Sequence, residues 1–521
     1  MVNVHFPARS PSRQGEHYDV IVLGAGISGI GAAYHLKKEL PDTNFVVLDE
    51  RESFGGTWIS HRYPGLRSDS DLYTFGYGFK PWKGAPIATA REILAYLGEV
   101  IEENDLSKRI RYRHCVRSAS WSSKANLWTL EVERIEDGSV VFLTTNFLWM
   151  CQGYYRHSAG YTPKWDGLDA FKGHVVHPQN WPADLALDGQ RVIVIGSGAT
   201  AATLIPAIAD RCAHVTMLQR SPTYFRTGRN AVELADTLRE LQVDEEWIHE
   251  IVRRRLLVDQ FAFTSRAFSE PEKVRKELLD GVRAALGPGS EEMVEKHFTP
   301  KYLPWRQRVA FVPDGDLFKA LKSGQASIVT DEIARFTENG IRLKSGQELT
   351  ADIVVTATGF EISALGDIPF EVDGKKLDFG QTITYRGMMF TDVPNLAWVM
   401  GYFRASWTLR ADLVAEFVCR LLGHMRQRAA SKVEVALREE DQGMDILPWV
   451  DDDNFNPGYI MRGVHLWPKR GDRPDWRPGD HYWTEKAEIR SIDLDDSAFV
   501  YDGRRAAPAK RKGAGTRALT G

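Results

Sequence analysis

Three glycines and one carboxylate near the start of the chain have the types and spacing that bind a dinucleotide. Gly24, Gly26 and Gly29 form a G-x-G-x-x-G motif directly after the apolar run 18–23, and a helical pattern follows. Gly24 permits a tight turn, Gly26 lets a pyrophosphate approach the backbone, and Gly29 lets the helix pack closely on the strand. Asp49 ends the next apolar run, where a carboxylate accepts hydrogen bonds from a ribose 2′-hydroxyl. This order predicts a first dinucleotide site, and the alternative is a plain turn followed by a solvated acid.

A second glycine loop occurs later in the chain and leads to a different residue type. After the apolar run 191–195, a G-x-G-x-x-A motif opens a helix with Gly196, Ser197, Gly198, Ala199 and Thr200. The next apolar run, 215–218, is followed by Gln219, Arg220 and Ser221 in place of an acid. A cation suits a 2′-phosphate, which a carboxylate would repel, so we expect the second dinucleotide to be NADPH rather than NADH. A solvated arginine at a strand end is the alternative.

Two longer motifs accompany these loops. Residues 171–182 fit Phe-x-Gly-x-x-x-His-x-x-x-Trp-Pro, with Phe171, Gly173, His177, Trp181 and Pro182 at the fixed positions. Residues 55–69 hold a glycine pair and a tryptophan, then Tyr-Pro-Gly and a closing acid, and so contribute Gly56, Thr57, Trp58 and Asp69. Alone, the first motif also fits a surface loop with packed aromatic rings. Together the two motifs resemble the type I Baeyer–Villiger monooxygenases, and residues 401–409 are most similar to their ethionamide-activating subgroup.

The resemblance covers about residues 18–425 and implies an FAD- and NADPH-dependent monooxygenase. In that family NADPH reduces FAD, the reduced flavin takes up O2 as a C4a-peroxyflavin, and the protein holds this adduct away from water. The adduct inserts oxygen beside the carbonyl of a small hydrophobic ketone, which gives an ester or a lactone. We expect oxidation of sulfides as well.

The same resemblance implies roles for individual residues. Asp69 is expected near the flavin, where it holds Arg308, the match to the catalytic arginine. A guanidinium stays protonated at working pH, so Arg308 would stabilise the peroxide and then an oxyanion without acting as an acid. His177 is expected to couple the domains rather than to transfer protons. Gln307 replaces a usual lysine and puts a second contact to the 2′-phosphate in doubt, which Arg306 could supply.

Two other functions remain open at this point. A heteroatom monooxygenase without significant ketone activity shares most of these motifs, although it normally lacks the Trp181-Pro182 pair. A flavoprotein that senses redox state without turnover would bind the same cofactors and be reduced only once. A disulfide reductase is excluded because Cys115 and Cys151 offer no cysteine pair near a flavin.

The elements that must position these residues indicate an α/β fold with two Rossmann-like domains, the second inserted in the first. We expect an FAD-binding domain over 18–158 and 366–502, an NADPH-binding domain over 159–225 and 301–365, a helical insertion over 226–300, an N-terminal extension over 1–17 and a disordered basic tail over 503–521. Alternating residues over 110–148 predict antiparallel strands, which close at Gln152, where relatives usually have threonine. The amphipathic helix from about Ser406 would direct its N-terminus at the flavin, or is a plain core helix.

Composition excludes several other classes of protein. Lys plus Arg number 66 against 70 for Asp plus Glu, so the net charge of -4 gives no reason to expect a nucleic-acid partner. The four cysteines have no C-x-x-C spacing, which predicts neither disulfides nor a metal site and suits the reducing cytoplasm. No export signal and no apolar run of about 18 residues is found, so no integral membrane segment is expected. The physiological substrate and the oligomeric state leave no linear motif.

Overall fold

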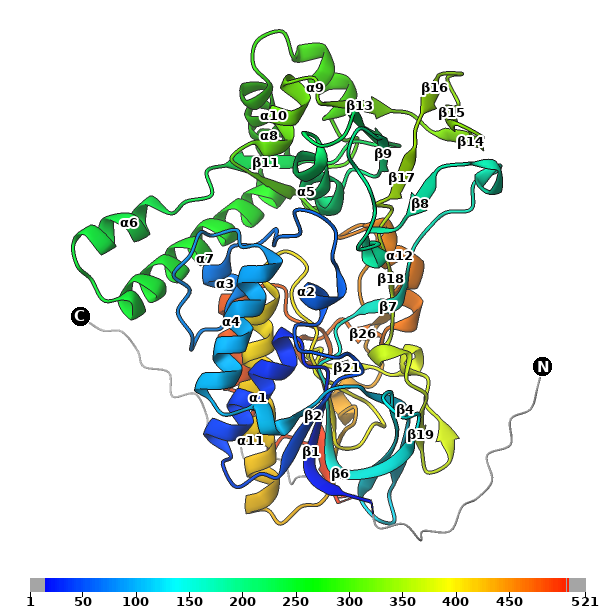
Figure 1. Ribbon diagram of the computed structural model, residues 1–521. Coiled ribbons are helices and arrows are strands. Elements are labelled where there is room, and N and C mark those ends of the chain that lie inside the picture. The colour runs from blue at the N-terminus through cyan, green and yellow to red at the C-terminus, as the bar shows by residue number, and fades with distance from the viewer. Residues whose placement is uncertain (1–14, 503, 506–521) are drawn as a thin grey trace, which may run out of the picture.

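The computed structural model describes residues 15–502 and 504–505 and has two lobes that pack against each other (Figure 1). The first lobe is built on a nine-stranded sheet with the order β20-β19-β4-β5-β6-β1-β2-β3, and β23 pairs with β6 off this path. Its strands are β1 (His17–Leu23), β2 (Phe45–Leu48), β3 (Ile110–Arg111), β4 (His114–Ser122), β5 (Leu127–Arg134), β6 (Val140–Met150), β19 (Phe370–Val372), β20 (Lys375–Lys376) and β23 (Leu396–Trp398).

The centre of the first sheet is parallel, and its rim is an antiparallel meander. β1 pairs in parallel with β2 and β6, whereas β4, β5 and β6 pair in antiparallel order, as the alternation over 110–148 predicts. Alternate residues of β1 enter different cores. Val20 and Val22 pack with α1 (Ile27–Glu39), α4 (Ala90–Glu103) and α11 (Trp407–Gln427), which cover one face. Ile21 and Leu23 pack on an aromatic core that includes the later segment around Trp449.

The second lobe contains a fully parallel five-stranded sheet with the order β13-β10-β9-β17-β8. Helices cover one face, because alternate strand residues pack there with α5 and α8, and a small antiparallel sheet covers the other. These elements are β8 (His174–Val176), β9 (Arg191–Ile195), β10 (His214–Gln219), β13 (Ala326–Thr330), β14 (Ile333–Thr337), β15 (Gly340–Leu343), β16 (Glu348–Thr350), β17 (Ile353–Thr356), α5 (Ala199–Ile208), α8 (Pro271–Leu286), α9 (Glu291–His297) and α10 (Asp316–Lys322).

Two chain crossings join the lobes. β7 (Tyr155–Gly160) leaves the first lobe and β18 (Phe360–Ile362) returns to it, and the two strands pair in antiparallel order. β23 then pairs in parallel with β6, so the last strand of the first sheet comes after the whole second lobe in the sequence. The mixed α/β fold with two Rossmann-like units, the second inserted in the first, is therefore confirmed.

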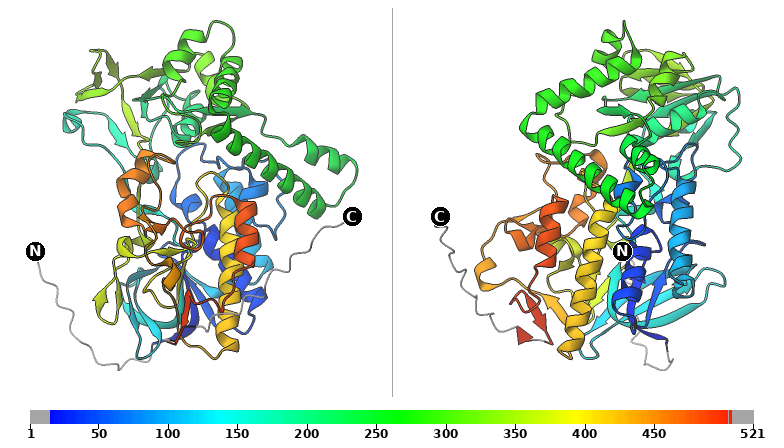
Figure 2. Two further views of the ribbon diagram at one scale, coloured as in Figure 1. Left: turned by 180° about the vertical axis from the view of Figure 1, so that it is seen from behind. Right: turned by 90° about the vertical axis from the view of Figure 1, so that its left-hand side faces the viewer.

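The expected helical insertion divides into two parts. It begins with β11 (Phe225–Gly228), which pairs with β12 (Ala310–Pro313), and its last helices, α8 and α9, belong to the core of the second lobe. The helices α6 (Glu233–Glu240) and α7 (Glu245–Ser269) instead form an arm that reaches back along the first lobe (Figure 2). Arg253 of α7 fixes this arm, because its guanidinium donates to the carbonyls of Tyr73 and Gly76 at 2.6 and 2.9 Å.

The segment after α11 packs against the first lobe. Its secondary structure continues into the segment that we expected to be a disordered tail. Residues 504–505 form β28, which pairs with β27, whereas the rest of the predicted tail and residues 1–14 lie outside the described residues. The other elements are α2 (Thr57–Ser60), α3 (Leu72–Phe75), β21 (Thr384–Tyr385), β22 (Met389–Phe390), β24 (Val433–Val435), β25 (Ile446–Leu447), α12 (Gly458–Gly463), β26 (Arg470–Gly471), α13 (Tyr482–Arg490), β27 (Phe499–Tyr501) and β28 (Arg504–Arg505). Over the described ranges, no helix is long and apolar enough to cross a bilayer.

Candidate active site

The three glycines of the first loop differ in what a side chain would meet at each position. Gly24 has φ +102°, and a Cβ built there would lie 2.7 Å from the carbonyl oxygen of Cys151. A Cβ on Gly29 would lie 1.8 Å from the carbonyl oxygen of Gly24, so helix α1 could not pack where it does. A Cβ on Gly26 would meet only Cα of Gly56, at 3.5 Å, which is ordinary contact. The protein itself therefore gives no reason for glycine at position 26, whereas a ligand on the loop would.

The N-terminus of α1 supplies donors beside that space. Gly26 is the N-cap residue, and no side chain caps the helix, so its first backbone amides lack a side-chain acceptor. Asp49 braces the loop, since Oδ2 accepts from the Ala25 amide at 2.6 Å and Oδ1 from the Arg51 amide at 2.8 Å. Burial raises the pKa of Asp49. Its contact with a ribose stays a prediction.

The second loop repeats this arrangement with even more open space. Gly196 has φ +132°, and a Cβ there would lie 2.2 Å from the Ala357 carbonyl oxygen, but a Cβ on Gly198 would have no neighbour within 4 Å. Gly198 is the uncapped N-cap of α5, and Thr200 follows in its first turn. Ser197 Oγ donates to the Ser221 carbonyl at 3.2 Å, which joins the loop to the end of β10.

Arg220 stands at the end of β10 beside this loop. Its side chain is exposed, and it makes no hydrogen bond or ion pair with any residue that the structure describes. The neighbouring Gln219 is buried and donates to the His297 carbonyl at 2.7 Å, so it belongs to the core. Arg220 interacts with Glu332 only through space and thus offers its guanidinium donors where the sequence predicts a 2′-phosphate contact, which stays a prediction.

The segment 55–69 lies over the first loop. Gly56, the N-cap residue of α2 with φ +54°, has its Cα against Gly26, so both glycines line one cradle. Thr57 and Trp58 begin α2, and the Trp58 ring packs edge-on to Phe75 at 5.8 Å. Asp69 is exposed, and Ser70 Oγ lies 3.5 Å from its Oδ1. Asp71, which follows this segment, caps α3, because its carboxylate accepts from the Thr74 amide at 2.9 Å.

Arg308 lies among three tyrosines where the two lobes meet. Its Nε donates to the hydroxyl of Tyr459 at 3.3 Å, and the hydroxyls of Tyr154 and Tyr155 lie 2.7 Å apart beside it. Burial alone would lower the pKa of Arg308, but the three tyrosines and the Asp69 carboxylate outweigh burial and raise that pKa well above its ordinary value. The guanidinium therefore keeps its proton beside these hydroxyl groups.

Asp69 and Arg308 do not touch. Within the described part of the chain no ion pair of 4.0 Å or less joins them, so Asp69 acts on the guanidinium through space. The partner that does touch Arg308 is Tyr459, which the sequence analysis missed. Tyr459 follows the expected catalytic arginine by 151 positions and belongs to no motif, so no local pattern could have indicated it.

The residues beside Arg308 contact the segment after α11. Gln307 Nε2 donates to Asn456 Oδ1 at 3.3 Å, and an Arg306 guanidinium nitrogen donates to the Asp453 carbonyl. Both side chains hold the segment after α11 in place. The suggestion that Arg306 supplies a second phosphate contact stays a prediction.

The fingerprint 171–182 packs on the connection between the lobes. The Nε2 atom of His177 faces the Gly359 carbonyl oxygen at 3.2 Å, and its Nδ1 accepts from the Gln179 amide at 3.2 Å. A Cβ on Gly160 would lie 1.9 Å from the His177 ring, so this imidazole sits directly against β7. Burial lowers the pKa of His177, which keeps the ring neutral. Its contacts suit coupling of the lobes, and that role stays a prediction.

The other fingerprint residues are structural in their contacts. A Cβ on Gly173 would lie 2.3 Å from the Asp352 carbonyl oxygen and 2.5 Å from the Phe171 ring. Phe171 is buried with the small sheet of the second lobe, and Trp181 is partly buried against the core around α5. Pro182 follows and ends the motif, and its carbonyl accepts from the Leu185 amide at 3.5 Å.

Two further groups face the same region, and sequence reasoning singled out neither as a ligand. Both polar atoms of the Gln152 amide are buried without a partner, and Gln152 adjoins Gly24, because a Cβ on that glycine would lie 2.9 Å from the Gln152 Cα. Trp407, the first residue of α11, donates from Nε1 to Ser28 Oγ at 2.8 Å. The helix begins after Ser406, as expected, so the uncapped N-termini of α11 and α1 lie side by side.

The structure has two glycine loops, and each lies ahead of an uncapped helix N-terminus. A permanent cation lies between the lobes. These features define the class of protein, an oxidoreductase that binds two dinucleotides. The comparisons agree. Residues 22–97 match the NAD(P)-binding Rossmann-like domain, and residues 86–230 match the flavin-binding monooxygenase-like family.

Relatives extend over almost the whole chain. The FAD-containing monooxygenase EthA of Mycolicibacterium smegmatis is 43% identical over 497 residues, which cover 94% of this chain and 98% of the relative. The probable FAD-binding monooxygenase AlmA of an Acinetobacter species is 43% identical over 500 residues, covering 95% and 98%. The chain therefore belongs to the flavin-binding monooxygenase-like family, and it is a flavin-dependent monooxygenase with FAD and NADP as its cofactors.

Solved structures support the fold. A steroid monooxygenase bound to NADP matches with a TM-score of 0.71 and 23% identity over 93% of this chain and 99% of that one. An ε-caprolactone-bound cyclohexanone monooxygenase matches with a TM-score of 0.71 and 21% identity over 93% and 100%. Both share the arrangement of two Rossmann-like units with this chain.

Proposed function

We propose that this monooxygenase performs Baeyer–Villiger oxidation, in which one atom of O2 is inserted beside a ketone carbonyl to give an ester or a lactone, and that it also oxidises sulfides. The observation that carries the proposal is the Arg308 guanidinium, which is half-buried among Tyr154, Tyr155 and Tyr459 and lacks a carboxylate within 4 Å among the described residues. A fixed cation without an ion-pair partner is suited to a transient anion.

The two dinucleotides supply a hydride and the activated oxygen when they are bound. Gly24, Gly26, Gly29 and Asp49 would hold FAD, with Gly56, Thr57 and Trp58 closing over it. The second loop, with Arg220 and Ser221, would hold NADPH. Each cradle has one glycine whose missing Cβ only a ligand explains, Gly26 in the first and Gly198 in the second.

Arg308 would then stabilise the oxyanion that forms when a ketone is attacked. A guanidinium keeps its proton, so it offers charge and donors without becoming an acid. Tyr459 orients it through the 3.3 Å hydrogen bond, and Asp69 adds a negative potential that keeps the cation in place. The tyrosines and the meeting of the lobes limit access of water.

The test is Arg308→Ala, measured with a panel of linear ketones, cyclic ketones and thioethers. Loss of one preorganised donor of this type lowers the rate by about a hundred- to a thousandfold. We expect flavin reduction by NADPH to survive in stopped-flow measurements, oxygenated product to disappear, and the consumed oxygen to appear as hydrogen peroxide. Lys301→Ala is the matched control, because Lys301 is an exposed cation on the same segment.

Normal ester formation by Arg308→Ala would remove Arg308 from the reaction. Sulfoxide formation by the wild-type protein without any ester would favour the heteroatom monooxygenase instead. A single flavin reduction that no ketone or sulfide accelerates would indicate a redox sensor.

All four cysteines are free thiols, which suits the proposed cytoplasmic location.

A further inference from the structure

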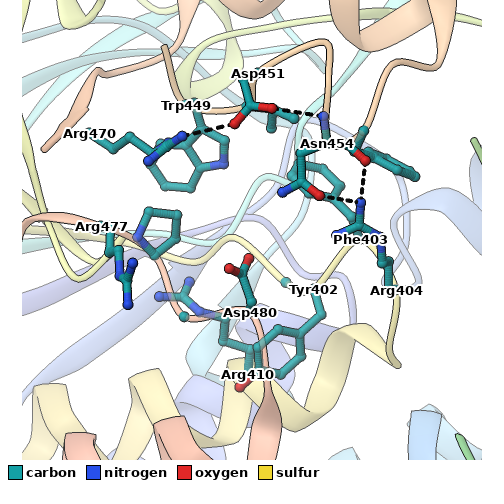
Figure 3. A pocket seen from close by; sticks show the side chains of 15 residues that line it. Tyr402, Phe403, Arg404, Arg410, Trp449, Asp451, Asn454, Arg470, Arg477 and Asp480 are labelled. Carbon is teal, nitrogen blue, oxygen red and sulfur yellow. Dashed lines mark hydrogen bonds and ion pairs between the residues drawn. The ribbon is translucent and has the colours of Figure 1, made fainter. Parts of the chain in front are cut away.

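A cavity of about 240 Å³ lies near the Arg308 site, between the start of α11 and the segment after it (Figure 3). Its walls combine aromatic rings with an unusual number of charges. The rings are those of Tyr402, Phe403, Trp449 and Phe455, and the charged groups are Arg404, Arg410, Arg470, Arg477, Asp451 and Asp480. The sequence analysis expected a small hydrophobic substrate, and a hydrophobic molecule alone gives no reason for four arginines in the cavity wall.

Two of the four arginines are neutralised by the protein. Arg410 is 1% exposed, its Nε lies 3.0 Å from a Glu485 oxygen, and a terminal nitrogen donates to the Met400 carbonyl at 2.5 Å. Arg470 pairs with Asp451 at 3.0 Å. Both pairs are structural, since each guanidinium already has its counter-charge.

The other two arginines have none. Arg404 donates only to neutral acceptors, the Trp305 carbonyl at 3.2 Å and the carbonyl and Oδ1 of Asn454 at 2.6 and 2.9 Å. Its guanidinium also stacks on the ring of Phe455 at 5.0 Å. Burial lowers the pKa of Arg404 to about 10, and the through-space effect of nearby carboxylates does not offset burial. Arg477 is exposed and has no hydrogen bond or ion pair within the described ranges.

Two carboxylates act on Arg404 through space, Asp480 more strongly than Asp451. Asp480 lines the cavity without a hydrogen bond to any described residue, and it stabilises the charge of Arg404 from a distance. Asp451 is occupied by Arg470 and by the Asn454 amide at 2.7 Å. Arg306 adds further positive charge near Arg404. The cavity therefore holds an excess of uncompensated positive charge.

We propose that this cavity binds the carboxylate of an acidic substrate, with Arg404 and Arg477 as the anion subsite and the aromatic rings against its apolar body. This inference rests on the proposed function and narrows its substrate to ketones or sulfides that carry an acid group. Nη1 of Arg404 makes no hydrogen bond with a described residue and can donate to one carboxylate oxygen, and a partly desolvated arginine strengthens that contact. The exposed Arg477 guanidinium has its whole fork available for a bidentate contact.

The loop 454–456 links the cavity to the segment that carries Arg308. Asn454 contacts Arg404 in the cavity, and two residues later the Asn456 amide donates to the Arg306 carbonyl at 2.9 Å, next to the segment that carries Arg308. An acid held by Arg404 would thus leave the apolar part of the same molecule free to extend toward Arg308. The separation between acid and ketone should then set which substrates react.

The experiment compares levulinate and its longer-chain homologues with their methyl esters. The wild-type holoenzyme should prefer the acid, with a maximum at one chain length. Arg404→Gln should lower kcat/KM for that acid by about ten- to a hundredfold and leave the ester unchanged, since only the charge-assisted bonds are lost. Arg477→Gln, at an exposed position, should act in the same direction even if Arg404→Gln folds poorly.

Two variants act as matched controls. Asp480→Asn removes the opposing charge and should increase the preference for the acid. Arg490→Gln changes an arginine that pairs with Glu416 at 2.7 Å outside the cavity, and it should change nothing. The opposite signs of Arg404→Gln and Asp480→Asn distinguish an anion site from a general loss of structure.

Equal use of acid and ester by the wild-type enzyme would overturn the anion subsite and leave the proposed function intact. Inhibition by inorganic phosphate should be weaker than inhibition by a saturated carboxylate with the chain length of the preferred acid. Equal inhibition would also overturn the carboxylate subsite, because the arginines would then bind any free anion. Calorimetric binding of that carboxylate to the holoenzyme, with no ketone or sulfide oxidised, would support the subsite and refute the proposed function.

Discussion

Gly26→Val separates the structural glycines of the first loop from the one that serves a ligand. Gly26 has φ −79° and ψ −172°, an extended conformation that any residue adopts, and its built Cβ lies 3.5 Å from the nearest atom, Cα of Gly56. The apoprotein should therefore tolerate the substitution at a cost of less than about 1 kcal/mol. Gly29→Ala is the contrasting variant, since its Cβ would lie 1.8 Å from a carbonyl oxygen.

The effect on FAD should be far larger than the effect on folding. The valine methyls would fill the space in front of the α1 amides, so the pyrophosphate would lose its hydrogen bonds there. Each charge-assisted bond contributes about 1.5–3 kcal/mol, so the loss of two weakens FAD by about a hundred- to ten-thousandfold. Gly198→Val should do the same to NADPH alone, since no atom lies within 4 Å of its Cβ.

The assay needs two measurements on one preparation. Thermal unfolding of the apoprotein reports the fold, and titration with FAD, followed by quenching of flavin fluorescence, reports the affinity. We expect Gly26→Val to unfold at nearly the wild-type temperature and to purify colourless. Wild-type FAD affinity in Gly26→Val would refute the first nucleotide site, and an apoprotein as unstable as Gly29→Ala would show that Gly26 is structural.

Three further predictions follow from single contacts. Arg220→Ala should weaken NADPH by about ten- to a hundredfold and NADH hardly at all, because only NADPH has a 2′-phosphate; equal losses in calorimetric titrations would place the phosphate site elsewhere. His177→Ala should slow turnover with ketone and sulfide substrates alike, since His177 contacts the strands that join the lobes, and loss of one chemistry with normal flavin reduction would argue for a direct role. Burial lowers the pKa of His61 from 6.5 to about 4. Between pH 6.5 and pH 4 the unfolded chain therefore binds more protons than the folded chain. The free energy of unfolding falls by roughly 3 kcal/mol as the pH drops through this range. His61→Gln should flatten that slope in thermal unfolding from pH 7 to pH 5, and an unchanged slope would contradict the assignment.

The sequence alone determined the parts of this protein whose physics is local. A glycine at the turn, one at the helix packing contact and one beside the ligand lie within six residues, and the geometry of Gly24 and Gly29 agrees with the reasons inferred for them. The parallel core was predictable because β2 and β9 are continuous apolar runs, and the return of β23 to β6 follows from the insertion. The Asp71 cap of α3 is equally local, since its carboxylate accepts from an amide only three residues further on.

Only the tertiary structure decided what surrounds Arg308 and what lines the cavity beside α11. Tyr459 reaches Arg308 across 151 residues, and Asp69 acts on it through space rather than by the direct contact that was expected. The charge balance of the cavity depends on which arginine meets which carboxylate: Arg410 finds Glu485, whereas Arg404 finds only neutral oxygens. Such pairings join segments that are distant in the chain, and no spacing rule encodes them, because packing of the whole fold sets the distances on which electrostatic interactions depend.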